Sequence, residues 1–265
     1  LLQPPFLMDF ELFRQVAARV VSGDAAHLYD PAGSAQGLFK YAPCWAVLLA
    51  PLGWLSRHAG AVLWASLTVA WLTLTCRVSD RLCRVMGLQP APCLAVAAVL
   101  LLVRPITAEF LLGQTNLLWG LLVACSTLFT ATNRPWRAAA CLALAISLKL
   151  PAAVFLAYFA LRGSWNMVGR TVLCAAAING AAMLLLSPAH PQLLFGSWLR
   201  VLLISGPDRA FEIGSQSFLA LLGRLLRNDG YGLNPLALSD STVAAIAAVC
   251  EAALIAAPAM RRRRQ

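Results

Sequence analysis

Residues 59–76 read AGAVLWASLTVAWLTLTC, eighteen consecutive residues without a charged side chain. A helix that crosses a bilayer needs about 20 mostly apolar residues, so this stretch predicts a membrane span. Arg77, Arg81 and Arg84 follow directly. Because Lys and Arg gather on the cytoplasmic side of membrane proteins, we expect this end of the span to face the cytoplasm.

The composition of the whole chain agrees with a membrane protein. Hydrophobic residues make up 60% of the 265 residues, charged residues only 12%, and the mean hydropathy is +0.73. Soluble domains carry about 25% charged residues. The apolar runs are continuous, unlike the alternating segments of about ten residues in barrels. We therefore predict an all-α, polytopic transmembrane helical bundle.

The net charge of +10 in a soluble protein would suggest nucleic acid as a partner. Here the run Arg261–Arg264 follows an apolar stretch, so we interpret it as a cytoplasmic anchor and expect no nucleic acid partner. The eight cysteines form no CxxC pair, and the three histidines are scattered. Asp9, Glu11, Asp24 and Asp30 match no metal motif either. We expect no disulfide framework, metal or cofactor.

A short polar segment precedes the apolar stretches. Residues from Asp9 to about Val21 predict an amphipathic helix, with Asp9 as its N-cap and Glu11 facing solvent. Its apolar stripe consists of Phe10, Phe13, Val16 or Ala17, and Val20. A carboxylate at the edge of a membrane domain is a functional candidate by default. Asp9 is therefore either an ordinary cap or a reactive group.

The apolar segments predict a single membrane domain, 1–265, with about seven spans. Residues 1–42 form a first periplasmic loop, 43–186 hold transmembrane helices, 187–241 form a long periplasmic loop, 242–260 the last span, and 261–265 a cytoplasmic basic tail. Within this scheme, about 93–103 runs outward and stops at Arg104-Pro105, and 117–132 returns inward.

The segment 138–161 has two possible topologies. Apolar residues 138–148 and 152–161 flank Lys149-Leu150-Pro151. One topology is a single kinked span with Lys149 at its middle. The other is a pair of short helices with Lys149 at an outer turn, which keeps Arg162, Arg170 and the Arg261–Arg264 run inside. Charge bias favours the pair, whose short helices fit only where the membrane is locally thin or a cavity is lined.

With that topology, polar residues from distant segments fall on the outer face. They are Asp9, Lys40, Arg104, Glu109, Gln114, Asn116, Lys149, Gln216 and Ser217. Lys and Arg there could neutralise a phosphate, and Asp could act as a general base toward a hydroxyl. The set therefore predicts a site for an anionic ligand that enters from the lipid.

The order of short motifs resembles a known family. An Asp-Phe opening is followed by Leu28-Tyr29, Phe39-Lys40-Tyr41-Ala42-Pro43, Pro51-Leu52, Gly113-Gln114-Thr115-Asn116, Lys149-Leu150-Pro151 and Ser215-Gln216-Ser217-Phe218. Over nearly the whole chain, this succession resembles the bacterial membrane glycosyltransferases of family 87. That resemblance implies the type-C fold and a polyprenyl-phosphate sugar as donor, commonly the mannose form.

The resemblance also implies roles for individual residues. Type-C enzymes carry a catalytic carboxylate in the first outer loop, a place that Asp9 matches, and transfer is expected to invert the anomeric centre. From position and charge, Lys40, Arg104 and Lys149 are expected to hold the lipid phosphate. The remaining substrate-binding candidates are Tyr41, Gln114, Asn116, Gln216 and Ser217. The expected partners are the donor, a lipid or glycan acceptor and membrane lipids, at the periplasmic face of a bacterial inner membrane.

Two other functions fit parts of the sequence. Broken helices and charges within the membrane also suit a transporter or flippase of an anionic substrate, although no inverted repeat is found. A non-catalytic membrane scaffold is the other alternative. The family pattern places a transmembrane helix before the catalytic loop, and only eight residues precede Asp9. We therefore expect the chain to be a piece of a longer protein; its oligomeric state stays open.

Overall fold

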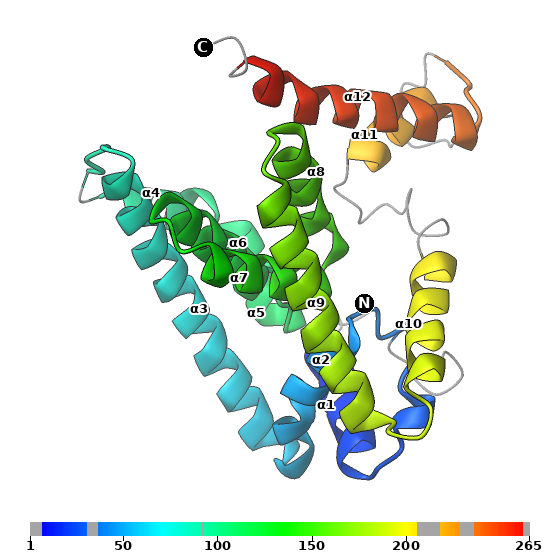
Figure 1. The fold of residues 1–265 in the computed structure, drawn as a ribbon. Coiled ribbons are helices and arrows are strands. Elements are labelled where there is room, and N and C mark those ends of the chain that lie inside the picture. Colours follow the sequence, from blue (N-terminus) through cyan, green and yellow to red (C-terminus); the bar gives the residue numbers. More distant parts are fainter. Residues whose placement is uncertain (1–6, 31–36, 92, 206–217, 228–235, 262–265) are drawn as a thin grey trace. The chain divides into compact units, whose positions relative to one another are not determined.

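The computed structural model describes residues 7–30, 37–91, 93–205, 218–227 and 236–261. Within these ranges, every regular element is helical (Figure 1). The α-helices are α1 (Met8–Val21), α2 (Pro43–Leu49), α3 (Arg57–Val85), α4 (Leu94–Leu101), α5 (Val103–Leu112), α6 (Asn116–Ala131), α7 (Pro135–Leu148), α8 (Val154–Leu161), α9 (Trp165–Leu186), α10 (Pro191–Ser205), α11 (Phe218–Leu226) and α12 (Asp240–Arg261). Short 3-10 helices are η1 (Ala25–His27), η3 (Ala50–Trp54) and η4 (Leu150–Ala153). The all-α prediction is confirmed for the described residues.

The chain forms two compact units. The first comprises Leu1–Ala153 and Asn166–Trp198, and the second comprises Val154–Trp165 and Leu199–Gln265. In the second unit, α12 packs against α8 and α11, and Arg227 Nε lies 2.8 Å from Asp240 Oδ1. The segment 187–241, expected as a loop, contains α10 and α11. The last predicted helix, 242–260, is present as α12.

Two helices of the described chain, α3 and α9, are long and apolar enough to cross a membrane. Their large apolar side chains, such as Val62, Val69 and Leu185, are exposed, as expected for contact with lipid. The pair α4 and α5 qualifies as a third span only if the 64° bend between them is included. The seven predicted spans are thus not confirmed; several apolar helices are shorter.

The bend between α4 and α5 corrects one boundary. The sequence predicted a span over about 93–103 that stops at Arg104, whereas α4 ends at Leu101 and α5 begins at Val103. Arg104 therefore lies inside the first turn of α5, although Pro105 follows it. Proline is tolerated in a first turn because its missing N–H would have no partner there.

Helices α6 and α7 form an antiparallel hairpin that packs, through α6, against α3 (Figure 1). Ser126 Oγ near the end of α6 donates to Ala138 O near the start of α7, at 2.9 Å. Completely buried alanines, among them Ala139 and Ala143, allow the two backbones to approach closely. Arg134 and Arg137 are exposed at the turn, so the opposite end of the hairpin holds Asn116 and Lys149.

Helix α9 runs parallel to α7. The Arg170 guanidinium lies 5.4 Å from the ring centre of Trp136 at the start of α7. Further along, Asn179 Nδ2 donates to Ser147 Oγ at the end of α7, at 2.8 Å. Because both helices start at the same end, the chain reverses after Lys149 and returns before α9. This geometry agrees with the pair of short helices and disagrees with one kinked span.

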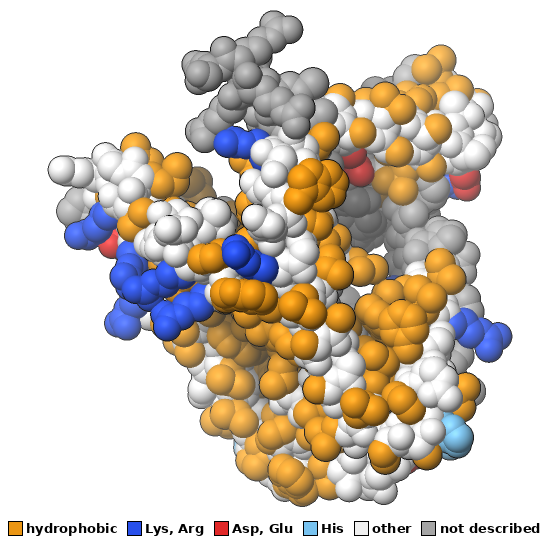
Figure 2. Space-filling view, viewed as in Figure 1, with side chains coloured by type: hydrophobic (Ala, Val, Ile, Leu, Met, Phe, Trp, Pro, Cys, Tyr) orange, Lys and Arg blue, Asp and Glu red, His pale blue; other side chains and the backbone are white. Residues whose placement is uncertain are grey.

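Basic side chains mark one end of the first unit. Arg77, Arg81 and Arg84 are exposed in the last turns of α3. Figure 2 shows Lys and Arg side chains gathered near this end, while hydrophobic side chains cover much of the visible face elsewhere. The turn between α6 and α7 carries further exposed arginines. The uneven distribution of basic residues along the sequence is therefore also seen between the two ends of the first unit.

Helix α1 packs its predicted apolar stripe against α3 and η3. Phe10, Phe13, Val16 and Ala17 are buried, and the Phe13 ring centre lies 5.1 Å from that of Trp64. The prediction that Asp9 caps this helix is wrong. The helix begins at Met8, its N-cap is Leu7 with φ 61°, and no side chain caps it.

The expectation for Glu11 is also wrong. Its side chain is 15% exposed and pairs with Arg14 Nη2 at 2.8 Å and Arg57 Nε at 3.2 Å. Hydrogen bonding to Arg14, more than any other cause, lowers the pKa of the Glu11 carboxyl. The Arg57 contact joins α1 to the first residue of α3, so Glu11 helps to fix α1 rather than facing solvent.

Candidate active site

Glu109 anchors a polar cluster where α5 ends and α6 begins. The Glu109 side chain is 2% exposed and accepts hydrogen bonds from Asn116 Nδ2 and from Leu117 N, both at 2.9 Å. A carboxylate bound to a backbone N–H at a helix N-terminus is stabilised by the helix dipole. The sequence analysis predicted Glu109 on the outer face and gave it no role. In the structure, its carboxylate holds Asn116 and the start of α6 in place.

Asn116 links the remaining members of the cluster. Its Nδ2 group also donates to Gln114 Oε1 at 2.6 Å, and its Oδ1 atom accepts a hydrogen bond from Lys149 Nζ. The Lys149 ammonium additionally feels the charges of Glu109 and Asp9. Three of the predicted substrate-binding residues, Gln114, Asn116 and Lys149, come from two separate stretches of sequence and meet at the same end of the α6–α7 hairpin.

Asp9 joins this cluster from the first turn of α1. Gln114 and Lys149 both lie close enough to Asp9 to influence its carboxyl group. Burial raises the pKa of the Asp9 carboxyl above its ordinary value, while Lys149 and Gln114 partly oppose that effect. A carboxylate that is less well solvated than usual is a stronger base, as a proton acceptor needs.

A close backbone approach brings Asp9 to this position. Leu7 N donates to Leu111 O at 2.7 Å, so the start of α1 is bonded to the end of α5. Gly113 then adopts a φ of 70°, and a Cβ atom there would lie only 2.6 Å from Phe10 Cβ. Glycine permits both the positive φ and the contact. The glycine of the Gly113-Gln114-Thr115-Asn116 motif thus allows Asp9 to lie beside Gln114.

The break at Lys149 follows from the next proline. Lys149 has extended backbone angles and ends α7. Pro151 has no N–H with which to bond to the carbonyl of Ser147 four residues earlier. That carbonyl accepts instead from Ala42 N at 3.0 Å. The proline therefore both ends the helix beneath Lys149 and frees an acceptor that ties down the Lys40-Tyr41-Ala42 segment.

Tyr41 forms one wall of the cluster. Its ring centre lies 5.2 Å from that of Phe13, and its carbonyl accepts from Tyr29 Oη at 2.9 Å. Burial, followed by the negative charge of Asp9, raises the pKa of the Tyr41 phenol. The carbonyl of Lys40, the preceding residue, accepts from Trp198 Nε1 at 3.2 Å. The Lys40-Tyr41-Ala42 segment is thus held by hydrogen bonds from two sides.

Asn179 is a site-supporting residue that sequence reasoning missed. From the membrane-capable helix α9, its Oδ1 atom accepts from Cys44 N at 3.3 Å, and its Nδ2 group donates to Ser147 Oγ at 2.8 Å. One amide within the apolar stretch 170–186 was the available signal, because polar groups in spans usually have a specific partner. Asn179 joins α9 to the start of α2 and to the residue two before Lys149.

Other predicted residues are not brought into the cluster. Arg104 is exposed in the first turn of α5, and a ten-residue helix, about 15 Å long, separates it from Gln114. Gln216 and Ser217 lie outside the described residues. Among the described residues, no group of three or more His, Cys, Asp and Glu side chains is arranged to hold a metal ion.

A helical domain with membrane-capable helices, a partly desolvated carboxylate and an adjacent ammonium has the parts for group transfer involving an anionic lipid. The family model that matches the chain is glycosyltransferase family 87, over residues 39–265. The chain belongs to this family. The stretch with the predicted Lys40, Gln114 and Lys149 lies inside the match, and Asp9 precedes it.

Curated relatives carry more specific descriptions. A polyprenol-phosphate-mannose-dependent alpha-(1-2)-phosphatidylinositol mannoside mannosyltransferase of Mycobacterium tuberculosis is 31% identical over 203 residues, covering 68% of this chain and 45% of that protein. A pentamannoside mannosyltransferase of the same dependence from Mycolicibacterium smegmatis is 30% identical over 219 residues, covering 80% and 50%. The chain therefore spans about half the length of these relatives. No solved structure matches.

Proposed function

We propose that this chain is part of a membrane mannosyltransferase that moves mannose from a polyprenyl-phosphate donor to a lipid or glycan acceptor. Membership in family 87 supports glycosyl transfer, and the similarity to polyprenol-phosphate-mannose-dependent mannosyltransferases supports the mannosyl donor. By analogy with those relatives, a lipid that already bears mannose is the acceptor class to test first. The observation that carries the proposal is the meeting of Asp9, Gln114 and Lys149 at one end of the α6–α7 hairpin.

The reaction is a single displacement at the anomeric carbon. The acceptor hydroxyl oxygen forms the new bond to that carbon while the bond to the phosphate oxygen breaks, which inverts the configuration. The phosphate leaves with the bonding electron pair, and Lys149 neutralises part of its charge. Asp9 accepts the hydroxyl proton as general base. Gln114, which lies beside Asp9, orients the Asp9 carboxylate with its side-chain amide.

The cluster lies opposite the basic ends of α3 and of the α6–α7 turn. Since arginines mark the cytoplasmic side, we place the reaction at the periplasmic face of a bacterial inner membrane, with the chain crossing it several times.

The first test is transfer by Asp9→Asn. Membranes with the wild type or the variant in the full-length protein receive radiolabelled polyprenyl-phosphate mannose, and the products are extracted. We expect the variant to lose about 10²- to 10⁴-fold in rate, the range for loss of a general base, because an amide cannot accept the proton. A matched control is Asp24→Asn, since Asp24 pairs with His27 at an exposed site. Full activity of Asp9→Asn would falsify the role of Asp9.

A further inference from the structure

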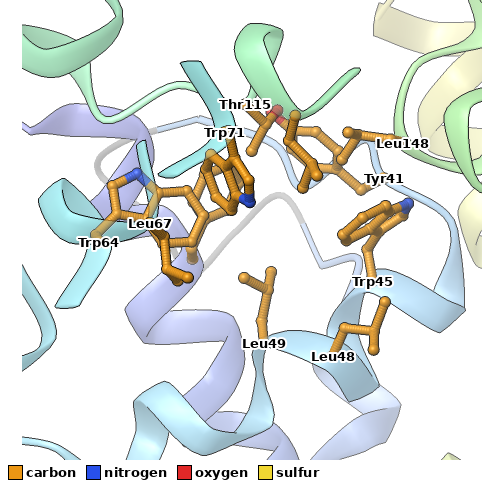
Figure 3. A pocket seen from close by; sticks show the side chains of 11 residues that line it. Tyr41, Trp45, Leu48, Leu49, Trp64, Leu67, Trp71, Thr115 and Leu148 are labelled. Atoms are coloured by element: carbon orange, nitrogen blue, oxygen red, sulfur yellow. The ribbon is translucent and has the colours of Figure 1, made fainter. Parts of the chain in front are cut away.

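An aromatic pocket lies among α1, α2, α3 and the start of α6 (Figure 3). It measures about 110 Å³. In Figure 3, Trp64 and Trp71 of α3 lie on one side and Tyr41 and Trp45 on the other, with Leu49 of α2 along a third. Its lining is almost entirely apolar. All lining residues belong to the first unit, so the pocket is a feature of that unit alone.

The pocket and the polar cluster share their walls. Thr115 lines the pocket and stands between Gln114 and Asn116, which belong to the cluster. Leu148 lines it and directly precedes Lys149. Each of these two lining residues is thus joined by a single peptide bond to a residue of the cluster, so the pocket and the cluster are neighbouring features. The two sites together fit a molecule with an anionic head and an apolar tail.

Size and polarity select which part of such a molecule enters. An apolar cavity of about 150 Å³ accommodates benzene, so a pocket of 110 Å³ suits a group of about five carbons. A hexose is larger and carries several hydroxyls that would each need a partner. A branched five-carbon isoprene unit has a suitable volume and no hydroxyl.

We propose that this aromatic pocket binds the first isoprene unit of the donor lipid, the unit attached to the phosphate. The proposal rests on the proposed function and adds to it how the donor is recognised. Tail recognition next to the phosphate lets the enzyme distinguish an isoprenoid donor from other lipid phosphates of the membrane. It also fixes the phosphate at Lys149, because head and first unit are joined by one oxygen atom.

The test compares two donors on the same full-length protein. One is polyprenyl-phosphate mannose, and the other is a straight-chain alkyl-phosphate mannose of equal carbon number. We expect the wild type to favour the isoprenoid donor in kcat/KM by about fivefold, the effect of one additional buried methyl group. Since both donors are assayed on one preparation, the ratio does not depend on the fraction of protein that folds.

Leu67→Trp fills the pocket from α3 and should bring the ratio close to one. Leu74→Trp is the matched control, because Leu74 is exposed on the same helix outside the pocket, and it should retain the wild-type ratio. An unchanged ratio in Leu67→Trp overturns the proposal. So does a change in preference between mannose and glucose donors instead, which would place the sugar in the pocket.

The two proposals fail in different ways. A wild type that transfers mannose from both donors equally well leaves the proposed function standing and removes the isoprene site, with bulk lipid as the occupant of the pocket. A wild type that transfers mannose from neither donor removes the proposed function and the isoprene site with it.

Discussion

Asp9 and Lys149 act on each other through charge, and this coupling has a measurable sign. Burial raises the pKa of Asp9, whereas the positive charge of Lys149 lowers it. In the proposed mechanism only ionised Asp9 is active, so kcat/KM rises with pH as Asp9 loses its proton. Because burial is the largest cause, this rise should occur above pH 3.8, the ordinary pKa of the group.

Lys149→Met removes the charge that lowers the pKa of Asp9. The pKa therefore rises further, and the acidic limb of the pH profile should move to higher pH, together with a weaker binding of donor. The measurement is kcat/KM for mannosyl transfer between about pH 4 and 8. A carboxyl group whose pKa is raised above its ordinary value loses its proton within roughly this range. Arg134→Met at the opposite end of the hairpin is the control. If the limb stays in place in Lys149→Met, the coupling has no role in catalysis.

The sequence singled out Asp9, Gln114, Asn116 and Lys149 because charged and amide groups beside apolar runs are costly. The structure brings these four residues together, and their roles in catalysis and binding stay predictions. The contacts that hold them could not be predicted. Glu109 received no role because its partners, the amide of Asn116 and a backbone N–H, are defined only by the bend of the chain at Gly113.

At the scale of helices, α9 is bonded to the site by one amide. Asn179 connects α9 with Cys44 N and Ser147 Oγ, and Ser147 O accepts from Ala42 N. Lys149 and Tyr41 are thereby fixed to the same membrane-capable helix. The sequence could not predict this link, because parallel packing of α7 and α9 was needed to bring residues 32 positions apart into contact.

Asn179→Leu should weaken this connection at nearly constant volume. We expect a loss of about 1–2 kcal/mol in stability, as for hydrogen bonds between membrane helices, and a higher KM for the donor. Thermal unfolding in detergent and donor titration measure the two effects. Thr171→Val on the same helix is the control, because the Thr171 hydroxyl bonds only within α9, to Met167 O at 2.9 Å. Equal effects of the two variants would contradict a positioning role.

Element boundaries were predicted less well than element types. The long apolar stretch 59–76 lies inside α3, as expected, yet α3 extends to Val85 through the arginines after it. The span over about 93–103 was predicted to stop at Arg104-Pro105, although proline fits a first helical turn and both residues lie in α5. Local sequence does not report a bend such as that between α4 and α5, which depends on what each helix packs against.

For the whole first unit, the parallel course of α7 and α9 shows that the chain returns, before α9, to the end at which α7 starts. Arg170 near the start of α9 lies against Trp136 at the start of α7, so the residues around 166 belong on the basic side. The charge bias of the sequence favoured this arrangement but left the kinked span open. Only a contact between distant segments distinguishes the two.

Single cysteines introduced into a cysteine-free background test this path. Asn166→Cys should react with a membrane-impermeant maleimide from the same side as Ala131→Cys, because both are exposed at the basic end of the unit. Ser22→Cys, after α1, should react from the other side. Labelling is compared in intact and inverted vesicles. Reaction of positions 22 and 166 from one side would restore the kinked span.

The length of the α6–α7 hairpin has a consequence for the surrounding lipid. Helix α6 has 16 residues and α7 has 14, which rise about 24 and 21 Å, less than the roughly 30 Å of a bilayer core. Such a hydrophobic mismatch deforms the adjacent leaflet, at a cost that sorts proteins among membranes of different thickness. The dip in the leaflet would form over the hairpin end that carries Asn116 and Lys149. A lipid phosphate arriving there sinks with its own headgroup layer and need not leave water to reach the ammonium.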